Sequence, residues 1–445
     1  MNRPAAMVTP IPVLEKRRKA ALAALGQGVL VLPAAPVQFS SRDGERPYHP
    51  DRELFYLTGA SEPGTLAVLV GGAEPRLVLF VRERDAEAEL WRGTRLGPEG
   101  AVERFRPDEC HPLAELGARL PDLLRSGDRI LFRLGRGDDI ERHVMEALAH
   151  RRARGARTGA GPRGVVDPGE ILDELRLVKD AHELTLLRRA AEVTVAGHRA
   201  AAASIAAGEG EWAVEAALHA AFRNAGAGGP GYESIVGSGA NACVLHYVEN
   251  ASVIERDALV LVDAGAEHGL YNGDVTRTYP AGGRFVGAAR EVYDIVEAAR
   301  RAAVAAVRPG APVAEVHALA TRVLVEGLVA LGALKGRVDE LIAAEAHKPF
   351  YPHQTSHWLG LDVHDVGDFA RDGVPRALEP GMVLTVEPGL YFRPDHPDTP
   401  ARLAGIGVRI EDDVEVTAHG CDVLTAALPT ASAEVAALVP SANGR

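Results

Sequence analysis

The sequence has few cysteines, no long apolar run and no cluster of basic residues. Its three cysteines, Cys110, Cys243 and Cys421, stand far apart and are odd in number, which excludes a disulfide framework and a Cys-x-x-Cys metal site. No uncharged apolar stretch reaches the roughly 18 residues of a membrane span, and Met1–Pro4 does not begin a signal peptide. These absences predict free thiols in a reducing compartment, the cytoplasm, and no membrane segment.

The charge is acidic and evenly spread. A formal net charge of −12 argues against a general nucleic-acid surface, and acidic and basic residues are interspersed, so there is neither a basic stripe nor an acidic tail. The chain has 445 residues, of which 47% are hydrophobic and 25% charged. These values are typical of a globular protein with two or three domains.

The first 150 or so residues alternate short apolar runs with helical spacing, a pattern that favours an α/β domain. The expected strands are 29–32, 66–70, 77–81 and 130–132, and the expected helices are 113–124 and 140–149. Residues 151–169 are rich in Arg, Gly and Pro and predict an exposed connection. We therefore expect one domain over residues 1–172 and a second over 173–445.

The second half has an α+β pattern. Its first two helices are expected at 181–207, with Gly208 as the C-cap, and at 211–224. Strands follow at 234–237, 258–263, 382–386 and 406–416, with helices at 290–307 and 313–331 between them.

Two aspartates of this half stand close together in the sequence. Asp263 ends an apolar strand, and the small Ala264-Gly265 pair after it would let a ligand approach the backbone. Asn272-Gly273 favours a tight turn, so Asp274 could return on a neighbouring strand and face Asp263. Taken singly, each aspartate is more often a turn or cap residue.

Three further candidates come later in the chain. Glu387 follows a buried apolar run, where a carboxylate is costly unless it is paired or binds a metal. His357 belongs to a histidine-rich stretch with His353 and His364, and any one of these alone would more often be a hydrogen-bonded core residue. The period of two places Arg409 on the same face as Glu411, so Arg409 could orient one of the acids or form an ordinary cross-strand salt bridge.

Four carboxylates and one imidazole are too many acids to gather without a cation, because neighbouring carboxylates raise each other's pKa. A pair of divalent ions neutralises them and produces hydroxide near neutral pH. The oxygen-rich donor set suits Mn(II) ahead of Co(II) and Zn(II). The sequence therefore predicts a two-metal hydrolase with the ligands Asp263, Asp274, His357, Glu387 and Glu411.

A series of segments in the second half resembles, in order, the catalytic domain of the aminopeptidase P family. These segments are Ile235–Asn241, Leu245–Tyr247, Val262–Gly265, Gly273–Thr278, Ser356–Asp365, Leu378–Gly389 and Gly405–Asp413. Asp51–Gly59 is similar to the family's N-terminal domain. The resemblance implies an α/β creatinase-like N-terminal domain followed by an α+β pita-bread catalytic domain.

The resemblance also implies roles for the candidate residues. Asp274 and Glu411 would bridge two metal ions, Asp263 would chelate one, and His357 with Glu387 would hold the other. His246, His353 and His364 would bind substrate, and His246 or His364 would stabilise the oxyanion. Tyr391 and Arg409 would support them, and Glu387 would act as proton shuttle, so the implied catalytic residues are His246, His364, Glu387 and Arg409.

The activity implied is release of the N-terminal residue from peptides with proline in second place. A metal-bridging hydroxide would attack the Xaa-Pro carbonyl. An Xaa-Pro dipeptidase (prolidase) shares the ligands and stays open as the alternative enzyme. A non-catalytic pita-bread peptide-binding module is the alternative from another class, although such relatives tend to lose ligands.

Two further segments bear on assembly and specificity. Leu90–Gly97 is similar to the segment with which bacterial members close the proline pocket of a neighbouring subunit through a tryptophan, here Trp91. This implies a homodimer or homotetramer, and the alternative is that Trp91 is a local packing residue. Gln354 follows His353 where the family usually has a small residue, which leaves the metal ligands unchanged but could alter substrate specificity.

Overall fold

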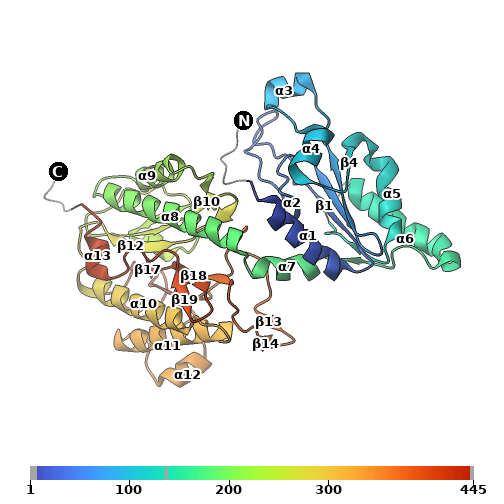
Figure 1. Cartoon of the computed structure of the whole chain (residues 1–445). Coiled ribbons are helices and arrows are strands. Elements are labelled where there is room, and N and C mark those ends of the chain that lie inside the picture. Colours follow the sequence, from blue (N-terminus) through green and yellow to red (C-terminus); the bar gives the residue numbers. More distant parts are fainter. Residues whose placement is uncertain (1–7, 136–138, 441–445) are drawn as a thin grey trace. The chain divides into compact units, whose positions relative to one another are not determined.

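The computed structural model describes residues 8–135 and 139–440, except for the side chains of residues 156 and 158. The chain forms two compact units, the first ending at Arg176 and the second beginning at Leu177 (Figure 1). Each unit has a hydrophobic core of its own. No helix in the described part of the chain is long and apolar enough to cross a membrane.

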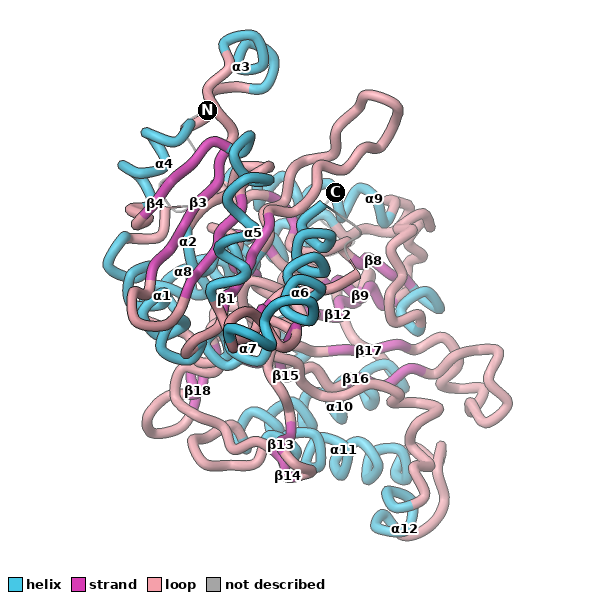
Figure 2. Tube along the Cα trace, turned by 90° about the vertical axis from the view of Figure 1, so that its right-hand side faces the viewer, coloured by secondary structure: helices cyan, strands magenta, loops and turns pink. Residues whose placement is uncertain are grey.

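The first unit is built on one mixed sheet with the strand order β4-β3-β2-β1-β5-β6. Its strands are β1 (Val29–Pro33), β2 (Leu66–Val70), β3 (Arg76–Val81), β4 (Glu109–Pro112), β5 (Ile130–Leu131) and β6 (Val165–Val166). Its helices are α1 (Ile11–Leu25), α2 (Arg52–Thr58), α3 (Ala86–Arg92), α4 (Gly97–Phe105), α5 (Leu116–Ser126) and α6 (Asp139–Thr158), and α7 (Gly169–Leu177) contains the junction. Figure 2 shows α5 and α6 beside this sheet, and their apolar side chains share its core.

The α/β pattern expected for this region is confirmed, with one correction. Residues 151–158, which we expected in an exposed connection, continue α6, and Val165–Val166 adds an edge strand to the sheet. Arginine is a good helix former, so an Arg-rich stretch does not by itself end a helix.

The second unit combines paired helices with several small sheets. Its helices are α8 (Ala181–Ser204), α9 (Glu211–Asn224), α10 (Gly287–Ala306), α11 (Val313–Ala330), α12 (Val338–Ala343) and α13 (Ser432–Ala436). Its first strands are β7 (Gly229–Pro230), β8 (Ile235–Ser238), β9 (Leu259–Asp263), β10 (Ala266–His268), β11 (Tyr271–Asn272) and β12 (Thr276–Pro280). The later strands are β13 (Ala370–Arg371), β14 (Val374–Pro375), β15 (Val383–Val386), β16 (Gly389–Tyr391), β17 (Gly407–Arg409), β18 (Asp412–Val416) and β19 (Cys421–Val423).

Three of these sheets matter for the site. They have the orders β12-β9-β8, β15-β18-β19 and β16-β17, and all their strand pairs are antiparallel. Helices α8 and α9 pack on each other, as do α10 and α11 (Figure 1). Apolar residues of these helices form one core with the β12-β9-β8 and β16-β17 sheets. Residues of α10 and α11 form a second core with β15 and β18, and together the two cores hold the strand ends in place.

Two sequence expectations for this unit were wrong. Helix α8 ends at Ser204 with Ile205 as its C-cap, so Gly208 does not cap it. The strand expected over 406–416 is two strands, because β17 pairs with β16 whereas β18 pairs with β15. The chain changes sheet at Ile410–Glu411, so Glu411 lies in the link between β17 and β18.

Candidate metal centre

The first two carboxylates lie beside a pair of antiparallel strands. Strand β9 ends with Asp263, whose backbone pairs with Thr276 at the start of β12. Asp274 precedes β12, and both aspartates are buried. The hydroxyl of Tyr232 donates to both carboxylates, at 2.6 Å to Asp263 Oδ1, so the two acids lie side by side.

The turn that brings Asp274 back is not at Asn272-Gly273, as the sequence suggested. It is formed by Gly269 and Leu270, whose φ angles of 61° and 72° are those of a type I′ hairpin. Gly273 lies against Gly265 instead, since a Cβ built on Gly265 would come within 1.6 Å of the Gly273 carbonyl oxygen. Gly265 is thus required by a neighbouring backbone rather than by a ligand.

Two glutamates come from the sheet that contains β15 and β18. Glu387 directly follows β15, and Glu411 directly precedes β18, its antiparallel partner. The backbone N–H of Glu411 donates to the carbonyl of Thr276 at 3.0 Å. This bond joins the two sheets and brings Glu411 to the aspartates.

His357 is held against strand β15. Its carbonyl accepts the N–H of Thr385 at 2.9 Å, and its own N–H donates to Thr385 Oγ1 at 3.2 Å. Ring atom Nδ1 lies 3.0 Å from the carbonyl oxygen of Trp358 and therefore carries a proton. Nε2 then faces the acids, 3.4 Å from Asp274 Oδ2 and 3.6 Å from Glu387 Oε1. In its neutral form this tautomer offers Nε2 to a metal.

These side chains fit a divalent cation. Ligand atoms of Asp274, His357 and Glu411 lie within 4.8 Å of one another. Burial, and then repulsion from Asp274 and Glu387, raises the pKa of Glu411 well above its ordinary value. Burial also raises the pKa of Glu387 to about 7. Burial alone would lower the pKa of His357, but its hydrogen bond to Asp274 and the charge of Glu387 raise it to about 9. Without metal the cluster retains protons, as crowded carboxylates do when no cation neutralises them.

Arg409, at the end of β17, is bound by three side chains. Its guanidinium forms an ion pair with Asp263 and donates to Tyr391 Oη at 3.0 Å and to Thr276 Oγ1 at 3.1 Å. Burial alone would raise the pKa of Asp263, but Arg409 and Tyr232 hold it below its ordinary value. The acid that Arg409 contacts is therefore Asp263, from another sheet.

A cavity of about 490 Å³ opens onto this cluster. All the candidate ligands line it, namely Asp263, Asp274, His357, Glu387 and Glu411. His246, His353, His364, Gln354 and Arg409 line it as well. The structure thus brings together every predicted site residue of the second unit except Tyr391, which lies behind His353 and contacts it.

The histidines of the cavity differ in their surroundings. His353 Nε2 lies 2.8 Å from Tyr391 Oη, and burial, with a further contribution from Arg409, lowers the pKa of His353 to about 3. The rings of His357 and His364 meet edge to face, with centroids 4.5 Å apart. Burial and the charge of His357 lower the pKa of His364. His246 is exposed at the cavity.

Trp91 belongs to α3 of the first unit, and 81% of it is exposed. The alternative that Trp91 is a local packing residue is therefore wrong.

Two residues that the sequence did not reveal contact the ligands. Tyr232 donates to Asp263 and Asp274, as described above, and Thr276 Oγ1 donates to Glu411 Oε2 at 2.7 Å. Tyr232 stands in a loop with no distinctive pattern. Thr276 does lie in one of the segments that resemble the family, where its place at the start of a strand after Asp274 was the available signal.

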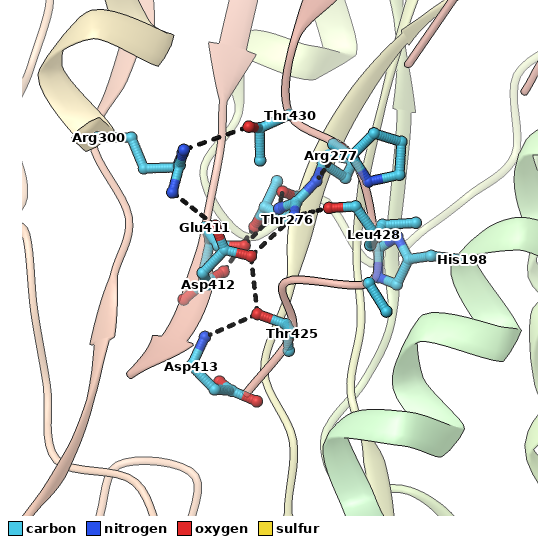
Figure 3. Close-up of polar contacts among 12 residues, drawn as sticks. His198, Thr276, Arg277, Arg300, Glu411, Asp412, Asp413, Thr425, Leu428 and Thr430 are labelled. Carbon is cyan, nitrogen blue, oxygen red and sulfur yellow. Dashed lines mark hydrogen bonds and ion pairs between the residues drawn. The ribbon is translucent and has the colours of Figure 1, made fainter. Parts of the chain in front are cut away.

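A network of buried charges surrounds Asp412, the residue that follows Glu411 (Figure 3). The side chain of Arg277 is wholly buried and donates to Asp412 Oδ1 at 2.7 Å. Asp412 also accepts from Arg300 at 3.0 Å and from Thr425 at 2.7 Å. The remaining N–H groups of Arg277 donate to the backbone carbonyls of Thr276, Glu411, Leu428 and Pro429. Arg277 therefore joins the strand after Asp274 to the segment that contains Glu411.

A second buried ion pair supports the histidine loop. Lys179 Nζ lies 3.0 Å from Asp365 Oδ2, and these side chains are 0% and 1% exposed. The N–H of Asp365 donates to the carbonyl of Trp358 at 2.9 Å, which closes the loop that contains His364. A Cβ on Gly360 would lie 2.1 Å from the Asp365 carboxylate, so only glycine leaves room for this pair.

Each unit of this chain matches a family of known proteins. Residues 185–418 match metallopeptidase family M24, and residues 14–132 match the N-terminal domain of aminopeptidase P. The chain belongs to metallopeptidase family M24. As a member of this family it is a metallopeptidase that binds divalent metal, and the expected fold class is confirmed.

Members of the family from several organisms resemble it over almost its whole length. An Xaa-Pro aminopeptidase of Escherichia coli (strain K12) is 42% identical, with 96% of this chain and 98% of the relative covered. The structure of Pseudomonas aeruginosa aminopeptidase PepP has a TM-score of 0.92 and 44% identity, covering 97% of this chain and 98% of that one. A zinc-substituted E. coli aminopeptidase P in complex with product has a TM-score of 0.92 and 41% identity, with 97% and 98% covered.

Proposed function

We propose that this metallopeptidase releases the N-terminal residue from peptides whose second residue is proline. The observation that carries the proposal is the cavity that opens onto the buried acids and His357. Relatives that match almost the full chain, including the one from E. coli, are Xaa-Pro aminopeptidases. An Xaa-Pro bond lacks an N–H, so recognition of it depends on the carbonyl group and the ring.

We further propose that the centre holds two divalent ions, with Mn(II) preferred and Co(II) or Zn(II) accepted. The ligands are Asp263, Asp274, His357, Glu387 and Glu411, of which Asp274 and Glu411 would be shared between the ions. Four carboxylates and one imidazole favour hard or borderline cations. Bound ions supply Lewis-acid activation of water and of the scissile carbonyl.

The side chains around the ligands bind and orient the peptide. His246, His353 and His364 line the cavity, where they contact the substrate. His246 and His364 can each present a ring N–H to a substrate carbonyl group, whereas the N–H of His353 is already donated to the carbonyl of Gln354. Glu387 lines the cavity beside His357, where its carboxylate can also serve as the proposed proton shuttle. Arg409 acts through Asp263 and Tyr391, which it contacts.

Three finer points belong to the same proposal. Trp91, exposed in α3, closes the proline pocket of a second copy in a homodimer or homotetramer. Gln354, at the cavity, influences the residues accepted after proline. The enzyme works in the cytoplasm, a location consistent with the free thiols of Cys110, Cys243 and Cys421.

The test is hydrolysis by metal-stripped protein with and without Mn(II). The substrates are an Xaa-Pro dipeptide, Xaa-Pro-Yaa, a longer Xaa-Pro peptide and an Xaa-Ala control. We expect Mn(II)-dependent release of the first residue from all peptides longer than the dipeptide except the Xaa-Ala control. Cleavage of the dipeptide alone would identify a prolidase, and no turnover with no metal retained would identify a binding module.

A further inference from the structure

One carboxylate of the cavity does not belong to the metal centre. Among the described residues that line the cavity, the acidic ones are Asp263, Asp274, Glu387, Glu411 and Glu233. The first four are the candidate ligands, and their charge is neutralised when metal binds. Glu233 is exposed at the cavity and adds a negative charge that the ligand set does not account for.

The backbone around Glu233 is held on both sides. Tyr232 is fixed through its hydroxyl, which donates to Asp263 at 2.6 Å. Ser234 is buried, its carbonyl accepts from Asn250 Nδ2 at 2.9 Å, and its hydroxyl lies 2.8 Å from His219 Nε2. Glu233 therefore has a defined position at the cavity.

The carboxylate of Glu233 is available to a ligand. Within the described part of the second unit it forms no hydrogen bond and no ion pair. An exposed carboxylate beside a peptide-binding cavity attracts a cationic group, and the attraction is weakened by salt.

The geometry of a peptide indicates which cation this is. The α-amino nitrogen is two bonds from the scissile carbonyl carbon and so lies within about 2.5 Å of it, at the metal centre. An exposed carboxylate at the cavity is better placed for the end of a long side chain. Ile235, Leu245 and Val248 line the same cavity, and apolar surfaces of this kind accommodate the methylene stems of Lys and Arg.

We propose that Glu233 is a specificity-determining residue that favours arginine or lysine as the first residue of the substrate. The proposal rests on the proposed Xaa-Pro aminopeptidase activity and specifies its substrate class. An exposed ion pair of this kind favours the basic substrate by about two- to fivefold in kcat/KM.

The test compares Arg-Pro-Ala, Ala-Pro-Ala and Ala-Pro-Arg with Mn(II)-loaded protein at low and high salt. The variants are Glu233→Gln and, as a control with the same change in net charge, Glu249→Gln. Glu249 is exposed and does not line the cavity. We expect the parent enzyme and Glu249→Gln to prefer Arg-Pro-Ala over Ala-Pro-Ala at low salt. In Glu233→Gln the ratio of the two kcat/KM values should fall to about one, and high salt should have the same effect on the parent.

Three results would overturn the proposal: no preference in the parent, a preference retained in Glu233→Gln, or an equal loss in both variants. A preference for Ala-Pro-Arg that depends on Glu233 would also overturn it, because the cation recognised would follow the proline. Cleavage of Ala-Pro-Ala by the parent tests the underlying activity separately. If that peptide is not cleaved, the proposed function itself fails and the specificity proposal fails with it.

Discussion

Glu411 and Asp412 are adjacent in the chain, yet their charges are compensated in different ways. Asp412 is surrounded by protein donors, because Arg277, Arg300 and Thr425 all bond to its carboxylate (Figure 3). Glu411 receives one hydroxyl, from Thr276, and otherwise faces other acids that raise its pKa. The protein supplies two arginines to Asp412 and none to Glu411, which agrees with the proposal that Glu411 is a metal ligand.

Of these two neighbouring residues, Asp412 has a structural role and Glu411 is the one proposed to bind metal. A buried carboxylate that is matched by arginine gives a fixed scaffold, whereas an unmatched one costs stability until a cation binds. The Arg277 network contacts the backbone of both Thr276 and Glu411, so it helps to position Glu411 and the strand that follows Asp274. Glu411 and Asp274 are two of the proposed ligands.

The largest expected effect comes from removing an acid on the metal side. Asp274→Asn should lower kcat/KM for an Xaa-Pro peptide by about 10⁴-fold, since the ions supply several kcal/mol of transition-state stabilisation. Bound metal, measured by mass spectrometry, should decrease as well. Asp257→Asn, at an exposed site, is the control. Retention of both metal and activity by Asp274→Asn would contradict the assignment of this ligand.

The next effect comes from the network around Asp412. Arg277→Met leaves Asp412 buried with one cation fewer, which should lower the free energy of unfolding by about 3–5 kcal/mol. Urea denaturation measures this quantity. Arg301→Met removes an arginine whose side chain is 70% exposed and should change stability little. Equal losses in the two variants would show that the Arg277–Asp412 pair is not a structural support.

The third expectation concerns pH and the metal-free protein. His357 has an ordinary pKa near 6.5 when unfolded and about 9 when folded, so its contribution is fully present below pH 6.5 and is lost as pH rises through 9. Thermal or urea unfolding between pH 7 and 9 should show a loss of about 2–3 kcal/mol. Saturating Mn(II) should remove this dependence, because a metal ligand holds no proton. An identical slope in both forms would place His357 outside the metal centre.

The smallest effect concerns a hydroxyl that contacts the ligands. Tyr232→Phe removes the donor to Asp263 and Asp274 and should weaken metal binding by about tenfold. Titration with Mn(II) under competition from a chelator gives the affinity. Tyr247→Phe removes a hydroxyl that donates to a different acid, Glu211, at 2.9 Å, and should leave metal affinity unchanged. Equal affinities in the two variants would mean that Tyr232 does not act on the centre.

The sequence predicted β9 and β15, with an acid at or just after the end of each, because both features follow from local patterns. Asp263 ends an apolar run and Glu387 follows one, so the place of each carboxylate at the end of a buried strand could be read from its neighbours. The position of the hairpin could not, because Asn272-Gly273 is a common turn pair and Leu270 is unusual at a positive φ. Gly273 is instead glycine because α8 packs against it, where a Cβ would lie 2.5 Å from Thr194 Oγ1.

Contacts between distant segments were the part that sequence patterns could not supply. The Tyr232 hydroxyl bonds to aspartates on two later segments, and Arg277 bonds to Asp412, which is distant in the sequence. The partner of Arg409 was left open for the same reason, because a periodic pattern shows which face a side chain occupies but not which sheet lies opposite. The division of the expected 406–416 strand into β17 and β18 likewise depends on two separate partner strands, β16 and β15.

The buried pair Lys179–Asp365 also bears on the smallest fragment able to fold as a peptidase. The family match begins at residue 185 and ends at 418. Lys179 lies before that region, and the carbonyls of Leu428 and Pro429 that bind Arg277 lie after it. A fragment trimmed to the matched region would keep every candidate ligand but leave Asp365 without its lysine and Arg277 without two of its acceptors. A fragment that keeps both contacts would therefore have to begin before Lys179 and end after Pro429.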